Sequence, residues 1–119
     1  MAAKQILYVE DNEDNIYMLK RRLERKGYQM HIAYTGEEGV QKVKELELDL
    51  ILMDLTLPGI SGFEAIEQIR LTNTSLPIIV LSAHAMDSYM NESTAAGAND
   101  FDTKPVDLKR LILKIESFI

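Results

Sequence analysis

The stretch Leu48–Glu64, LDLILMDLTLPGISGFE, decides the fold class of this chain. It contains a short run of apolar residues, Leu50 to Met53, with no alternation between apolar and polar side chains. Continuous apolar runs are typical of strands that are covered on both faces, as in a parallel sheet. The run meets Asp54, and a Pro-Gly turn and a helix start signal at Ser61 follow. We therefore expect a strand, a polar loop and a helix, which together form one unit of an α/β fold.

The same pattern extends outward in both directions. Ile6 to Val9 and Ile78 to Leu81 are also continuous apolar runs, whereas Gln29 to Ala33 and Asp100 to Thr103 are mixed in polarity, as strands at sheet edges often are. Apolar residues at spacings of three and four lie between these segments and indicate helices. Strands and helices that alternate five times predict a doubly wound (βα)5 fold, with a parallel sheet and helices on both faces.

Capping residues mark the starts of the expected helices. Thr35 with Glu38 and Ser61 with Glu64 have the spacing of a capping box, in which each side chain binds a free backbone N–H of the first turn. The helix expected over Asp87–Ala96 has the least regular apolar spacing in the chain. That helix should therefore be the one most easily displaced.

Composition limits the class of protein. The chain has 119 residues, 46% hydrophobic and 27% charged, so we expect one domain over residues 1–119 and no output domain. A net charge of −6 disfavours direct binding to nucleic acid or membrane. The absence of cysteine excludes disulfides, thiolate metal sites and a thiol nucleophile. The N-terminal apolar run is too short for a signal peptide, so the cytoplasm is the expected location.

Polar side chains follow the central strands. The first strand runs into Glu10 and Asp11, the third meets Asp54, the fourth Ser82 and the fifth Lys104. The carboxyl ends of parallel strands meet at one edge, where open α/β sheets bind ligands. Clustered carboxylates repel each other unless a cation compensates them, and Mg²⁺ prefers such oxygen ligands. A metal and a lysine suit a phosphoryl group, and without Cys or a strand-end His the expected nucleophile is a carboxylate.

Each of these residues also has an ordinary structural explanation when it is taken alone. An acid after a strand is usually a helix cap or a solvated loop residue. A lysine such as Lys104 is usually on the surface, and Ser82 and Thr56 are common turn residues. A functional site is favoured because all of these residues are expected at the same edge of the sheet.

The segments ILYVEDN, LDLILMDLTLPGISGFE, LPIIVLSA and GANDFDTKP follow one another as in the receiver (CheY-like) domains of two-component response regulators. The chain resembles this family along its whole length. The resemblance implies a flavodoxin-like three-layer sandwich with sheet order 2-1-3-4-5. It also implies a phosphorylation-dependent signalling switch, not an enzyme with an external substrate. Its partners would be a histidine kinase or histidine phosphotransfer protein and a downstream protein target.

The resemblance also implies a role for each residue of the acidic site. Asp54 would accept the phosphoryl group. Asp11 would bind Mg²⁺ directly, Glu10 would assist through water, and the backbone carbonyl of Thr56 would complete the protein ligands. Thr56 and His84 occupy positions that tune dephosphorylation. Neither carries a carboxylate or carboxamide, so the lifetime of the phosphoryl group stays open.

The same family pattern extends to the fourth and fifth strands. Ser82 and Lys104 would bind the phosphoryl oxygens, and the Lys104–Pro105 peptide bond would be cis. Phe101 stands at the aromatic switch position, where the ring moves inward when the hydroxyl of Ser82 engages the phosphoryl group.

Three other functions share parts of this pattern. A haloacid-dehalogenase-like phosphatase needs a second Asp two residues after the nucleophile, where this chain has Thr56. A flavodoxin-like FMN protein needs a Ser/Thr/Gly-rich loop after the first strand, where this chain has Glu10–Asn12. A receiver that only binds partners would lack an acid or the lysine. The pattern of Glu10–Asn12 with Asn15 is similar to receivers of hybrid histidine kinases and of some stand-alone regulators, so both contexts stay open.

Overall fold

The computed structural model describes residues 2–84 and 87–119. Within these residues five strands alternate with five helices, as the sequence predicts. The elements are β1 (Gln5–Val9), α1 (Glu13–Arg25), β2 (Gln29–Ala33), α2 (Gly36–Glu45), β3 (Leu50–Asp54), α3 (Gly62–Thr72), β4 (Ile78–Ser82), α4 (Asp87–Ala96), β5 (Asp100–Thr103) and α5 (Leu108–Phe118). None of the helices in the described part of the chain has the length and apolarity to span a membrane.

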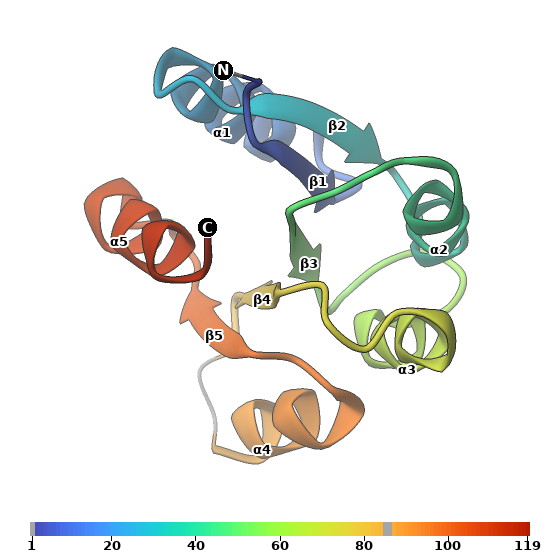
Figure 1. Cartoon of the computed structure of the whole chain (residues 1–119). Helices are drawn as coiled ribbons and strands as arrows, with labels where there is room; N and C mark the ends of the chain where they lie inside the picture. The colour runs from blue at the N-terminus through green and yellow to red at the C-terminus, as the bar shows by residue number, and fades with distance from the viewer. Residues whose placement is uncertain (1, 85–86) are drawn as a thin grey trace.

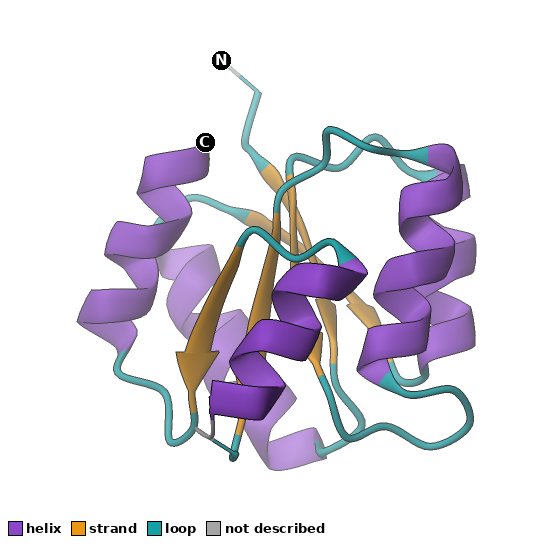
Figure 2. Ribbon diagram, turned by 90° about the horizontal axis from the view of Figure 1, so that it is seen from below, coloured by secondary structure: helices purple, strands orange, loops and turns teal. Residues whose placement is uncertain are grey.

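The strands form one parallel sheet in the order β2-β1-β3-β4-β5, which confirms the expected topology. Helices α1 and α5 cover one face, and α2, α3 and α4 cover the other (Figure 1). Figure 2 shows the strand arrowheads pointing to one edge of the sheet, away from the two termini. The chain changes direction across the sheet at β1 and β3, and ligands of such sheets bind beside this switch point.

Each face of the sheet has its own apolar core because the central strands carry apolar side chains on both sides. All five residues of β3 and of β4 are buried, whereas β2 and β5 at the edges are mixed. Val9 and Ile66 belong to the core under α2, α3 and α4. Tyr8 and Leu111 belong to the core under α1 and α5. The continuous apolar runs therefore correspond to two-sided burial, as expected.

Two strands extend beyond the apolar runs at their carboxyl ends. Asp54 continues β3 and is paired with Leu81, while Ser82 continues β4 and is paired with Thr103. Backbone hydrogen bonding does not depend on side-chain polarity, so a strand can extend into its polar end. As a result Asp54 and Ser82 are held by the sheet itself.

The predicted N-cap residues Thr35 and Ser61 cap α2 and α3, and at α2 the glutamate of the box also accepts a returning hydrogen bond. Thr35 Oγ1 accepts from the backbone N–H of Glu38 at 3.0 Å, and Ser61 Oγ accepts from that of Glu64 at 3.2 Å. In the first box the returning hydrogen bond is displaced by one residue, because Glu38 Oε1 accepts from the N–H of Tyr34 at 2.6 Å. These caps set the points at which both helices leave the sheet edge.

Helix α4 is the least anchored helix. Its buried residue is Ser93, whose hydroxyl bonds back to the carbonyl of Tyr89 at 2.7 Å. The turn that follows α4 is held from α3, because Arg70 donates to the carbonyl of Gly97 at 2.9 Å and to Asn99 Oδ1 at 2.9 Å. The weak apolar spacing in the sequence thus matches weak burial of the helix.

Candidate functional site

The predicted site residues lie at the carboxyl-end edge of the sheet. Glu10 follows β1 directly, Asp54 ends β3, Ser82 ends β4 and Lys104 follows β5. Their elements are neighbours in the sheet, and the backbone N–H of Lys104 donates to the carbonyl of Ser82 at 2.8 Å. The parallel register therefore brings side chains together that are far apart in the sequence.

Three carboxylates meet at this edge. Glu10, Asp11 and Asp54 each offer an oxygen, and these oxygens lie within 4.8 Å of one another. Glu10 and Asp54 are buried, with 1% and 6% of their surfaces exposed, whereas Asp11 is exposed. An ion arriving from solvent would thus meet Asp11 first and the two buried acids behind it. Hard oxygen donors grouped in this way fit Mg²⁺.

The two buried acids hold their protons with very different strength. Burial and the hydrogen bond and negative charge of Glu10 raise the pKa of Asp54 to about 6. Burial also acts to raise the pKa of Glu10, but hydrogen bonds from Lys104 and Asp54 outweigh it and lower that pKa. Glu10 is therefore the acid that stays ionised, and Asp54 is the one that takes up a proton first. A divalent cation would offset the negative charge of these two acids.

Lys104 contacts both buried acids. Its Nζ lies 2.5 Å from Glu10 Oε1 and 3.3 Å from Asp54 Oδ2. The Lys104–Pro105 peptide bond is cis, as predicted. One ammonium group between two carboxylates leaves the cluster with net negative charge, which again favours a metal ion.

The remaining predicted residues surround the acids. The backbone N–H of Thr56 donates to Asp54 Oδ1 at 3.3 Å. Ser82 is buried, and its Oγ accepts from the backbone N–H of His84 at 3.0 Å, so the hydroxyl is engaged locally. Phe101 lies half-buried beside Val80 and packs against the core under α2, α3 and α4.

His84 has a structural contact that the sequence left open. Its ring stacks on Tyr89 of α4 with centroids 5.1 Å apart, and Tyr89 stacks on Phe63 of α3 at 6.2 Å. The loop after β4 is therefore joined to α4 and α3 by aromatic contacts.

Two residues of the site were not predicted from the sequence. Tyr8 donates its hydroxyl to Glu10 Oε1 at 3.0 Å, and Asn15 Nδ2 donates to the same oxygen at 3.3 Å. Burial and the charge of Glu10 raise the pKa of Tyr8, so its phenol stays protonated and remains a donor. The signal available in the sequence is that Tyr8 carries a polar atom within an apolar strand, two residues before Glu10 and thus on the same face.

Close packing at the start of α3 also shapes the edge. A Cβ at Gly62 would overlap the carbonyl oxygen of Asp54 and lie 2.7 Å from Leu55 Cα. Only glycine lets the first turn of α3 approach the end of β3 this closely.

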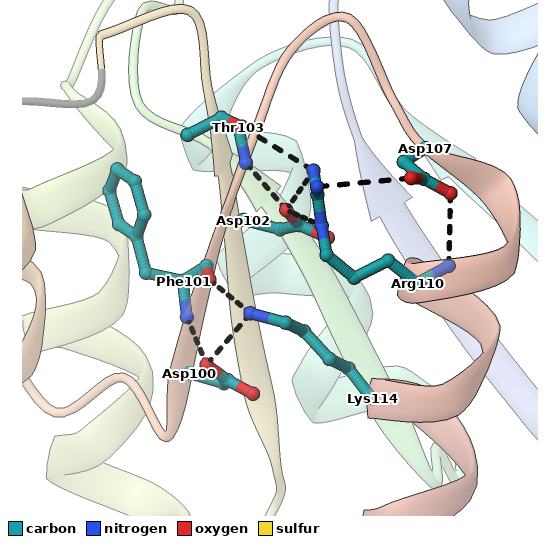
Figure 3. A network of polar contacts seen from close by, with 7 residues as sticks. All are labelled: Asp100, Phe101, Asp102, Thr103, Asp107, Arg110 and Lys114. Carbon is teal, nitrogen blue, oxygen red and sulfur yellow. Dashed lines mark hydrogen bonds and ion pairs between the residues drawn. The ribbon is translucent and has the colours of Figure 1, made fainter.

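A polar network joins β5 to α5 (Figure 3). Asp102 Oδ1 accepts from Arg110 Nε at 2.9 Å. Arg110 also lies 3.9 Å from Asp107, the N-cap residue of α5. Lys114 donates to the carbonyl of Phe101 at 2.7 Å and pairs with Asp100 at 3.3 Å. This network holds the strand that carries Phe101 and leads into Lys104.

Comparison with known proteins agrees with this geometry. Residues 6–116 match the sequence family described as the response regulator receiver domain. This chain belongs to that family. As a receiver domain of two-component response regulators it is a phosphorylation-dependent signalling switch. Receiver domains of response regulators take phosphoryl groups from histidine kinases.

The related sequences come from different contexts. The receiver domain is 37% identical to the uncharacterized transcriptional regulatory protein YkoG of Bacillus subtilis (strain 168), over 98% of this chain and 51% of that protein. It is 41% identical to the hybrid signal transduction histidine kinase G of Dictyostelium discoideum, over 90% of this chain and 3% of that protein. The chain thus spans about half the length of the first relative and a small part of the second.

Solved structures of similar chains include examples with magnesium. The response regulator TrrA from Thermotoga maritima, in complex with Mg²⁺ and BeF, is 30% identical with a TM-score of 0.90, over 98% of this chain and 99% of that chain. The receiver domain of a sensor histidine kinase from Pseudomonas aeruginosa PAO1, with a magnesium ion in its active-site cleft, is 31% identical with a TM-score of 0.92, over 98% of both chains.

Proposed function

We propose that Asp54 is the residue that accepts the phosphoryl group, with Mg²⁺ held by Glu10, Asp11, Asp54 and the backbone carbonyl of Thr56. The observation that carries this proposal is the cluster of three carboxylate oxygens within 4.8 Å. Asp54 is one of the two buried acids of the cluster, and its Oδ2 lies 3.3 Å from Lys104 Nζ. When bound, Mg²⁺ supplies positive charge for the oxygens of the phosphoryl group.

The reaction is a transfer between two covalent carriers. A carboxylate oxygen of Asp54 forms a bond to phosphorus while the bond from phosphorus to the histidine nitrogen of the donor breaks. The electron pair of that bond returns to the imidazole, and the product on this chain is an acyl phosphate. Lys104, whose Nζ is 3.3 Å from Asp54 Oδ2, would neutralise charge on the transferred group, and the hydroxyl of Ser82 would donate to it.

Ser82 and Phe101 would convert phosphorylation into a change of surface. Ser82 Oγ now accepts from the backbone N–H of His84 at 3.0 Å, and the hydroxyl would move from this position to donate to the phosphoryl group. The space behind it would be filled by the half-buried ring of Phe101. A downstream protein would then recognise the face formed by α4, β5 and α5.

The biological setting belongs to the same proposal. The donor would be a sensor histidine kinase or a histidine phosphotransfer protein, and the receiver would work either as a stand-alone regulator or as a module of a hybrid kinase. Catalysis would be limited to its own phosphorylation and dephosphorylation. The cytoplasmic location and the single-domain organisation over residues 1–119 remain predictions.

Mass spectrometry with a small phosphodonor tests the central assignment. With Mg²⁺ and acetyl phosphate the wild-type chain should gain one phosphoryl group, which peptide mapping should locate on Asp54. Asp54→Asn should not gain it, because an amide is not a nucleophile of this kind. Asp14→Asn, on the exposed first turn of α1, is the matched control and should react as wild type. Phosphorylation of Asp54→Asn at the same site would refute the proposal.

A further inference from the structure

Glu10 is held by more donors than its position after β1 would predict. Its Oε1 lies 2.5 Å from Lys104 Nζ, 3.0 Å from the hydroxyl of Tyr8 and 3.3 Å from Asn15 Nδ2. The other oxygen, Oε2, has one longer contact, from the backbone N–H of Asn12 at 3.4 Å. Three donors therefore converge on one oxygen of this buried carboxylate.

Of these donors, Tyr8 is the most rigidly placed. It is 1% exposed, its ring packs in the core under α1 and α5, and its backbone is paired with Ile32 and Leu52 on the two neighbouring strands. Its hydroxyl points along the same face of β1 as Glu10, two residues further on. A side chain held on both sides in this way cannot follow Glu10 if that carboxylate moves, so it defines where the carboxylate rests.

Lys104 is the least permanent of the donors. It is already shared with Asp54, at 3.3 Å from Oδ2. A phosphoryl group on Asp54 would bring more negative charge to that side and draw the ammonium group away from Glu10. A buried carboxylate that loses its closest donor is strongly destabilised unless other donors remain.

We propose that Tyr8, together with Asn15, is a positioning residue pair for Glu10, which fixes Oε1 so that this acid keeps its orientation toward the metal when Lys104 turns to the phosphoryl group. This inference rests on the function proposed above. It assigns to a tyrosine in the core strand a task in the magnesium site, without any contact to the reacting atoms. Donors that orient a metal ligand without touching the metal commonly set the affinity of the site.

Removal of a single atom tests the proposal. Tyr8→Phe keeps the ring and deletes the hydroxyl, and Mg²⁺ titration followed by amide NMR shifts should show a dissociation constant about three- to tenfold higher. Tyr28→Phe is the matched control. Tyr28 is partly buried in the same core, and among the described residues it makes no hydrogen bond to Glu10. Its dissociation constant should equal that of the wild type.

A second readout separates positioning from packing. The rate of phosphorylation by acetyl phosphate should fall in Tyr8→Phe at low Mg²⁺ and recover at saturating Mg²⁺, because only the affinity for the ion is altered. Asn15→Ala, at the first turn of α1, should show the same pattern. If Tyr8→Phe does not fold, the Asn15 variant tests the proposal by itself.

The outcomes distinguish this inference from the function on which it rests. A wild-type chain that neither binds Mg²⁺ nor becomes phosphorylated would refute the proposed function. A wild type that does both, with an unchanged dissociation constant in Tyr8→Phe and Asn15→Ala, would overturn the positioning role alone. A change in Tyr28→Phe as large as that in Tyr8→Phe would also overturn it, because the effect would then come from general packing.

Discussion

At the scale of single residues, Asp54 is the acid of the site whose ionised form is disfavoured. Its carboxylate is buried at the end of β3, close to the ionised Glu10, and Lys104 compensates only part of the charge. The pKa of Asp54 is raised from 3.8 to about 6, so the folded chain binds this proton more tightly than the unfolded chain does. In the absence of metal, ionised Asp54 thus lowers the stability of the folded chain.

Asp54→Asn should therefore stabilise the metal-free protein at neutral pH, by about 1 kcal/mol once screening by water and Lys104 is allowed for. Below pH 3.8 Asp54 is protonated in both states, and above about 6 it is ionised in both. The advantage of asparagine should be full above pH 6 and disappear as the pH falls toward 4. Urea unfolding in EDTA at several pH values measures it. A stabilisation that does not change between pH 4 and pH 7 would contradict this origin.

At the scale of elements, β5 and α5 are joined by a charged pair in which only one partner is buried. Asp102 is 4% exposed and faces the core beside Leu81, whereas the side chain of Arg110 is 45% exposed. Asp102 Oδ2 is buried and has no hydrogen-bond partner among the described residues (Figure 3). Such a carboxylate is tolerated because Arg110 reaches its other oxygen, and it contributes little net stability.

The two partners should respond oppositely to substitution. Asp102→Leu should raise the free energy of unfolding by about 1 kcal/mol, because an apolar side chain suits this core position and Arg110 remains hydrated. Arg110→Ala should lower the melting temperature, because it leaves the buried carboxylate uncompensated. Lys114→Ala is the control, since its partner Asp100 is half-exposed, and it should have the smaller effect. Calorimetry compares the three, and a destabilised Asp102→Leu would show that the pair stabilises the fold.

At the scale of the whole molecule, the site and helix α4 are joined through the loop after β4. The stack of His84 on Tyr89 and of Tyr89 on Phe63 connects this loop to two helices, and Ser82 bonds to the backbone of His84. Helix α4 has one buried residue, Ser93, so little apolar burial opposes its displacement. A change at Ser82 should therefore spread to α4 before it reaches the better-packed α3.

Hydrogen exchange with and without beryllofluoride tests this coupling. With Mg²⁺ and beryllofluoride, protection should change over residues 87–101 as well as in the loops at the sheet edge. Phe101→Ala should still be phosphorylated on Asp54 but show a smaller change over residues 87–101, because no ring fills the space behind Ser82. Protection changes confined to the edge loops in the wild type would rule out α4 as part of the output face.

Local signals in the sequence were enough to predict the order of the elements and the polar residues that stand at the strand ends. Continuous apolar runs identify β1, β3 and β4, capping-box spacings identify α2 and α3, and the acids and Lys104 lie at or just after strand ends. The strand order came from the family resemblance and not from periodicity. Periodicity says which faces are apolar, but it does not say which strands are neighbours.

Only the tertiary structure decided which groups hold the buried acids. Lys104 reaches Glu10 across 94 positions of sequence, and the hydroxyl of Tyr8 reaches Glu10 Oε1 at 3.0 Å. The burial of Asp102 likewise follows from the packing of α5 on β5, although the sequence around it is polar. Hydrogen bonds of this kind depend on angles and on distances of a few tenths of an ångström. Those are set when the sheet and helices pack, and no local pattern of residues encodes them.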